Sequence, residues 1–118
     1  MEWLLQHLHW VVGFAGVWSL GNGVLHDAFV LAQRKPFNKE KIRLLVDGHI
    51  LIFGGVVYLV CYNSLHAFNP TAWWMCMANA LFLIGYCLLI YRLLPSVGMI
   101  LLNALVIALL TLQNAAGL

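Results

Sequence analysis

Residues 44–62, LLVDGHILIFGGVVYLVCY, decide the fold class of this chain. The run holds a single charged side chain, Asp47, and has nearly the length of about 20 apolar residues with which a helix crosses the hydrocarbon core of a bilayer. Its apolar residues are continuous and do not alternate with polar ones, which argues against a transmembrane strand. In lipid, every backbone N–H and C=O needs a partner within its own segment, and a helix provides it. The run is therefore predicted to be a membrane-spanning helix.

Three other apolar runs of similar length lie before and after it. The predicted spans cover about residues 10–32, 44–62, 72–91 and 96–112. Asn69 precedes Pro70 and is placed to cap the third span, because asparagine is a preferred N-cap residue and proline is tolerated at the first helical position. The predicted fold is all-α: residues 1–118 form one transmembrane domain, an antiparallel up-down-up-down four-helix bundle.

The composition supports a membrane protein and excludes several other classes. Apolar residues make up 64% of the chain and charged residues 8%, whereas soluble domains contain about 45–50% apolar and about 25% charged residues. Ten charged side chains cannot cover the surface of a soluble domain of 118 residues. A soluble globular domain, a disordered chain and a nucleic-acid-binding protein are excluded on this ground.

The basic residues predict the orientation in the membrane. Five of the six lie between Arg34 and Arg43, and the sixth is Arg92, two spans later. Basic loops stay on the cytoplasmic side, so both segments are predicted to be inside and both termini on the non-cytoplasmic side. The expected location is a cell membrane, in the first instance a bacterial inner membrane, which the chain crosses several times.

Two acidic side chains, Asp27 and Asp47, fall within the predicted spans. Each would cost about 2.5–3.5 kcal/mol at the bilayer centre, so such residues are functional candidates in a membrane protein. Asp47 also follows Arg43 at the i, i+4 spacing that places two side chains on one helix face. An interfacial ion pair between them is the alternative explanation for Asp47.

His26 and His49 lie on adjacent antiparallel spans at nearly equal distances from the basic loop. Two histidines on facing helices can bind a haem iron from both sides, so these two residues are candidate haem b ligands. With Asp27 and Asp47 they could instead relay protons. Successive helical residues point about 100° apart, so the four side chains cannot all converge on one point and no four-ligand metal site is predicted; a histidine pair with one aspartate beside it, or an aspartate pair, fits the geometry.

Polar side chains are predicted to form an intramembrane polar cluster. Ser19, Asn22 and His26 share one face of the first span, with Gly16 and Gly23 beside it. In the second span Asp47, Gly54, Tyr58 and Cys61 share a face. The alternative is that these groups only join helices, at about 0.6 kcal/mol for each hydrogen bond. Asn103 is eight residues past Pro95 and is predicted to lie at roughly the depth of His26 and His49. The predicted cluster comprises Ser19, Asn22, His26, Asp27, Asp47, His49 and Asn103.

Three functional hypotheses follow from these observations. The first is a non-catalytic accessory subunit, or a protein that binds lipid or another apolar ligand, within a larger membrane complex; it has no catalytic residues and is not expected to be an enzyme. The second is a redox subunit that holds haem b or a metal ion with His26 and His49. The third is an oligomeric proton-coupled transporter or channel that uses Asp27 and Asp47. The expected partners are membrane lipids and another integral membrane protein or a second copy of the chain, and not nucleic acid.

Overall fold

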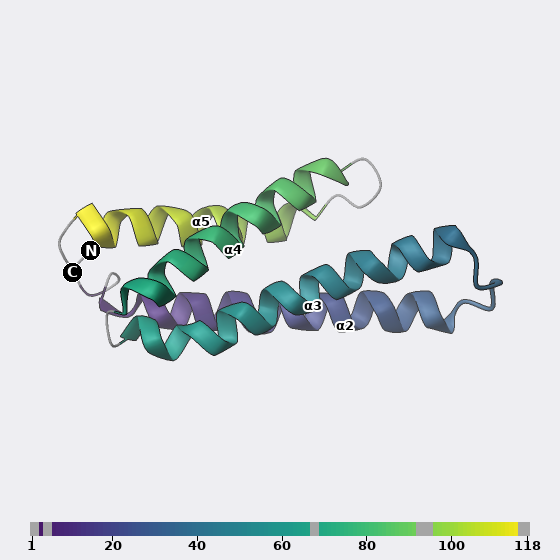
Figure 1. Ribbon diagram of the computed structural model, residues 1–118, viewed down its shortest axis with the longest axis horizontal. Coiled ribbons are helices and arrows are strands. Elements are labelled where there is room, and N and C mark those ends of the chain that lie inside the picture. Colours follow the sequence, from purple (N-terminus) through teal and green to yellow (C-terminus); the bar gives the residue numbers. More distant parts are fainter. Residues whose placement is uncertain (1–2, 4–5, 67–68, 92–95, 116–118) are drawn as a thin grey trace.

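Four helices form the protein in a computed structural model that describes residue 3 and residues 6–66, 69–91 and 96–115 (Figure 1). Each is long and apolar enough to cross a membrane, which confirms the all-α prediction of a small polytopic membrane protein. Arg92 and Pro95 lie outside the described residues. The helices are α2 (Leu8–Ala32), α3 (Lys39–His66), α4 (Pro70–Leu89) and α5 (Val97–Ala115).

The chain is arranged as two helical hairpins, α2–α3 and α4–α5 (Figure 1). Helix α3 also packs against α4, and α2 packs against α5. The start of α2 and the end of α5 lie at the same end of the molecule, as an even number of passes requires. Which side of the membrane this end faces stays a prediction from the basic residues.

Glycines bring α2 and α3 into close contact. A Cβ atom added to Gly55 would lie 2.6 Å from the carbonyl oxygen of Gly16, and one added to Gly23 would lie 2.6 Å from the carbonyl oxygen of Gly48. No side chain fits at such distances, so the two backbones approach as closely as glycine allows. The Ser19 hydroxyl lies between the two glycine contacts and donates a hydrogen bond of 2.7 Å to the carbonyl oxygen of Leu51.

A few polar contacts join α4 to α5 within the second hairpin and join α4 to α3. Asn69 caps α4 as predicted, with its side chain accepting a hydrogen bond of 2.9 Å from the backbone N–H of Thr71. Trp73 Nε1 donates to the carbonyl oxygen of Leu110 at 3.0 Å and joins α4 to α5. Asn79 Nδ2 donates to the carbonyl oxygen of Gly54 at 2.9 Å and joins α4 to α3.

The two hairpins differ in length, and this difference positions the polar residues. Helices α2 and α3 have 25 and 28 residues, whereas α4 and α5 have 20 and 19. At about 1.5 Å per residue, α4 and α5 just match a hydrocarbon core of about 30 Å. The α2–α3 hairpin projects beyond them at the end that carries the basic loop (Figure 1). The projecting part of α2–α3 therefore lies beyond the end of α4 and the start of α5 (Figure 1).

Candidate functional site

Asp27 and His49 form an ion pair between α2 and α3. His49 Nδ1 lies 2.8 Å from Asp27 Oδ2 and 2.7 Å from the carbonyl oxygen of Leu45. Both partners accept hydrogen bonds, so Nδ1 carries a proton. The His49 side chain is 70% exposed and that of Asp27 11% exposed. Asp27 Oδ1 is buried and has no hydrogen-bond partner among the described residues.

Asp47 is bonded to α4 rather than to its own helix. The Tyr86 hydroxyl donates a hydrogen bond to Asp47 Oδ1, and no ion pair joins Asp47 to Arg43 within the described part of the chain. The predicted Asp47–Arg43 ion pair is therefore wrong. The reason is tertiary, because a buried carboxylate accepts the nearby phenol of a packed helix while Arg43 stays exposed at the projecting end of α3.

The remaining members of the predicted cluster lie apart from this pair. His26 Nε2 donates to the carbonyl oxygen of Leu44 on α3 at 2.9 Å. Asn22 is exposed, and its amide nitrogen donates to the carbonyl oxygen of Trp18 in its own helix at 2.7 Å. Ser19 is buried in the α2–α3 contact.

Asn103 does not join the histidines, although its position in the fourth span suggested an equal depth. It accepts a hydrogen bond from the Tyr58 hydroxyl, and both residues are completely buried. Tyr58 is nine residues beyond His49 on α3, or about 14 Å along the helix axis. The depth prediction is wrong because α5 begins short of the α2–α3 turn. Asn103 therefore serves to join α5 to α3.

The two candidate haem ligands line different cavities. His49 lies at the edge of a groove between α3 and α4, whereas His26 lines a cavity between α2 and α5. Within the described residues, no group of three or more His, Cys, Asp or Glu side chains is placed to hold a metal ion. The haem b hypothesis stays a prediction from sequence.

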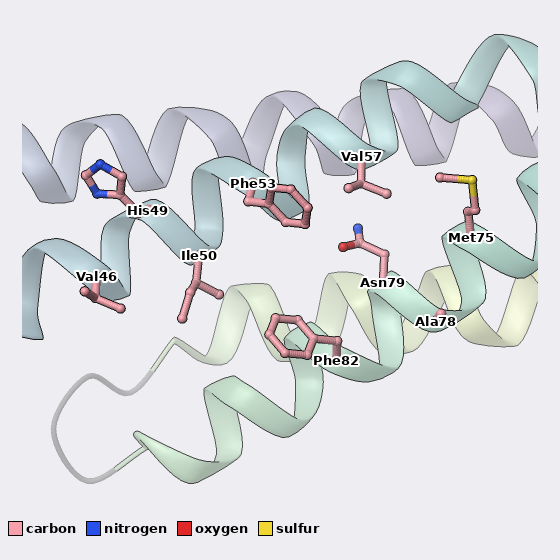
Figure 2. A pocket seen from close by; sticks show the side chains of 9 residues that line it. All are labelled: Val46, His49, Ile50, Phe53, Val57, Met75, Ala78, Asn79 and Phe82. Carbon is pink, nitrogen blue, oxygen red and sulfur yellow. The ribbon is translucent and has the colours of Figure 1, made fainter.

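The groove between α3 and α4, here called the α3/α4 groove, has a volume of about 550 Å³ and an apolar lining (Figure 2). The His49 ring points away from α4, while Val46 and Ile50 point towards it (Figure 2). The Asn79 amide is already bonded to Gly54. The groove therefore offers mainly hydrocarbon and aromatic surface. Its lining consists of Val46, His49, Ile50, Phe53, Val57, Met75, Ala78, Asn79 and Phe82.

A second groove, here called the α2/α5 groove, has a polar section and an apolar section. The polar section has a volume of about 360 Å³, and Asn22, His26 and Ser96 supply its polar side chains. The apolar section has a volume of about 320 Å³ and includes Phe14 and Leu105. Trp18 and Gly98 line both sections, which therefore lie next to each other along the same two helices. The other lining residues are Leu51, Val97 and Met99 in the polar section and Leu101 and Leu102 in the apolar section.

Several residues of these sites were not identified from sequence. From sequence alone, Trp18 is interpreted as a packing residue. Nothing in the sequence singles out Ser96, Gly98 or Tyr86 as a site residue. Trp18 and Gly98 are 80 positions apart, so only the packing of α2 against α5 brings them together. The position of Tyr86 one turn before the end of a span is typical of an interfacial tyrosine, but it does not predict Asp47 as the partner.

Comparison of the chain with protein-family models, with curated proteins and with solved structures gives no match.

Proposed function

We propose that the protein is a non-catalytic membrane protein that holds an amphiphilic lipid in the α2/α5 groove. The observation that carries this proposal is that a polar and an apolar section lie next to each other along the same two helices and share Trp18 and Gly98 in their lining. A membrane amphiphile has the same order of polarity, with a polar head and a hydrocarbon chain. Ligand sites combine apolar walls with a few polar groups that fix orientation.

The direction of the groove agrees with the direction of a lipid in a bilayer. Along α5, the polar section begins at Ser96 and the apolar section continues to Leu105. Ser96 immediately precedes α5, and the start of α5 lies at the end of the molecule nearer the basic loop (Figure 1), where we expect the lipid head groups. A bound lipid would place its head beside Asn22 and His26 and its chain deeper, against Phe14 and Leu105.

The remaining polar groups support a binding role rather than a catalytic one. Ser19, Asn79 and Asn103 are buried, and each forms a hydrogen bond that joins two helices. Asp47 is bonded to Tyr86 in the same way. The Ser19 contact holds α2 to α3, and the contacts of Asn79, Asn103 and Asp47 hold the second hairpin to α3. Membership of a larger membrane complex stays a prediction from sequence.

Filling the α2/α5 groove tests the proposal. Gly98 lines both sections, and a Cβ atom added there would meet its nearest neighbour, Trp18, at 3.9 Å. Gly98→Leu therefore fills the groove without forcing the helices apart. Gly85→Leu on α4 is the matched control, because a Cβ atom at Gly85 meets nothing within 4 Å and Gly85 lines neither groove. Lipid retained through detergent purification is measured by native mass spectrometry.

The wild-type protein and the Gly85→Leu variant are expected to retain a bound lipid, and Gly98→Leu is expected to lose it. Ala78→Leu, which fills the exposed α3/α4 groove, is expected to leave this lipid in place. Equal retention by Gly98→Leu and Gly85→Leu would refute binding in the α2/α5 groove. Loss of the lipid in Ala78→Leu alone would move the site to the α3/α4 groove.

A further inference from the structure

The polar section of the α2/α5 groove differs from a site for an anionic head. Among the described residues that line it, none is Lys, Arg, Asp or Glu. The basic residues that the structure describes lie between Arg34 and Arg43, in the loop after α2 and in the first turns of α3, and none of them lines this section. Charged lipid heads are recognised by clusters of Lys and Arg, and this section has no such cluster. Its selectivity must therefore come from uncharged hydrogen-bonding groups.

The hydrogen bonds already made inside the protein decide which atoms remain for a ligand. Leu44 O can only accept, so His26 Nε2 carries the proton that it donates. In the neutral imidazole the remaining ring nitrogen, Nδ1, is then an acceptor. The Asn22 amide nitrogen is used by Trp18 O, and its carbonyl oxygen remains as a second acceptor. Two acceptors from one helix thus lie in the lining of the polar section.

From this arrangement, and resting on the proposed function, we infer that the α2/α5 groove selects a neutral amphiphile whose head carries hydroxyl groups. A hydroxyl donates to His26 Nδ1 and to the Asn22 carbonyl oxygen, while the Ser96 hydroxyl and Trp18 Nε1 supply donors for the oxygens of the same head. An ionised carboxylate or phosphate diester head has no hydroxyl to donate, so it cannot form a hydrogen bond with these two protein acceptors. A monoacylglycerol has the inferred chemistry, with two hydroxyl groups, one ester and one hydrocarbon chain.

Three probes with the same hydrocarbon chain test the inference: 1-monooleoylglycerol, methyl oleate and oleate. The binding of each to the full chain in detergent is measured by native mass spectrometry. The wild-type protein is expected to bind 1-monooleoylglycerol about tenfold more tightly than methyl oleate, the difference of about 1.4 kcal/mol that one net hydrogen bond supplies. It is expected to bind oleate no better than methyl oleate. Tightest binding of oleate would overturn the inference.

Two substitutions identify the acceptors. Asn22→Leu and His26→Phe are each expected to remove most of the preference for 1-monooleoylglycerol over methyl oleate. Asn22 is exposed and bonds only its own helix, so its loss does not disturb folding. His26→Gln retains one donor and one acceptor and is expected to restore part of the preference. Asn114→Leu, an exposed asparagine near the opposite end of α5, is the matched control and is expected to change nothing.

The outcomes separate this inference from the proposed function. If Gly98→Leu weakens all three probes but the wild-type protein does not distinguish 1-monooleoylglycerol from methyl oleate, the groove binds lipid and the hydroxyl selectivity is refuted. If Gly98→Leu weakens none of the probes, lipid binding in the groove is itself refuted. A preference that survives both Asn22→Leu and His26→Phe would refute the assignment of these two acceptors.

Discussion

At the scale of single residues, Asp27 is a buried carboxylate with very few partners. One of its oxygens accepts from His49, and the other has no partner among the described residues. The carboxylate rests against Gly48, where a Cβ atom would collide with Oδ1. Burial of a charged group is costly unless it is paired and hydrogen-bonded. His49 is therefore expected to be important for stability even though its own ring is largely exposed.

His49→Ala is expected to lower the free energy of unfolding by about 1–3 kcal/mol, because it leaves a buried charged acceptor without its donor. SDS titration in mixed micelles, followed by circular dichroism, measures the change. Adding Asp27→Asn to His49→Ala is expected to recover part of the loss, since an amide is less costly to bury unpaired than a carboxylate. Val46→Ala, an exposed position one turn earlier on α3, is the control and should change stability by at most about 0.5 kcal/mol. Equal effects of His49→Ala and Val46→Ala would contradict the role given to the ion pair.

Tyr58→Phe is a second prediction at this scale. It removes the hydroxyl that donates to Asn103 and leaves a completely buried amide oxygen without a donor. The expected loss of stability is about 1–3 kcal/mol in the same SDS titration. Tyr62→Phe is the matched control, because the Tyr62 hydroxyl makes no hydrogen bond to the residues that the structure describes. A Tyr58→Phe variant as stable as Tyr62→Phe would show that the bond between α3 and α5 contributes nothing.

At the scale of helices, the α2–α3 hairpin depends on close glycine contacts that the hydropathy of the sequence does not predict. Gly16 and Gly23 face Gly55 and Gly48 across the contact, with the same seven-residue spacing on both helices. The repeat keeps the contact on one side of each helix over two turns. This explains why α2 and α3 form the tighter hairpin, while α4 and α5 can diverge from them and leave grooves on both sides of the molecule.

Gly55→Ala is expected to destabilise the protein by about 1–3 kcal/mol, since the added methyl group has backbone of α2 at 2.6 Å and the helices must separate. Gly21→Ala makes the same change on the lipid-facing side of α2, where nothing lies within 4 Å. It should be neutral or stabilising by up to about 1 kcal/mol, because alanine favours a helix more than glycine does. SDS titration of the two variants side by side measures this difference. If Gly55→Ala were as stable as Gly21→Ala, the close contact would be refuted.

At the scale of the whole molecule, the hairpins are of unequal length, and the longer one carries five of the six basic residues. Its projecting end places the loop beyond the end of α4 and the start of α5 (Figure 1). His26, Asp27, Asp47 and His49 lie in the halves of α2 and α3 that lead to this loop, so we expect them near the boundary of the apolar layer rather than at its centre. Their predicted cost of burial in lipid is correspondingly smaller, and the polar section of the α2/α5 groove opens at this same level.

The orientation in the membrane is tested by labelling introduced cysteines with a membrane-impermeant thiol reagent. Phe37→Cys lies in the basic loop, and Asn114→Cys lies near the opposite end of the molecule; both positions are exposed. Asn114→Cys is expected to react in intact cells and Phe37→Cys only after permeabilisation, because basic loops stay inside. The three native cysteines are buried and give a low background. Reaction of both positions in intact cells would contradict the crossing of the membrane between them.

The sequence by itself determined that the chain forms four helices, each long and apolar enough to cross a membrane, and that Asn69 caps the third of them. These features follow from local composition and from the length of each apolar run, which need no knowledge of the neighbouring helices. Tertiary structure alone decided that Asp27 pairs with His49, that Asp47 bonds to Tyr86 instead of Arg43, and that Asn103 meets Tyr58. The physical reason is that pairing across helices depends on the relative depth and rotation of each helix. Close glycine contacts and unequal hairpin lengths set both quantities here, and the same offset brings Trp18 and Gly98 together as the centre of the α2/α5 groove.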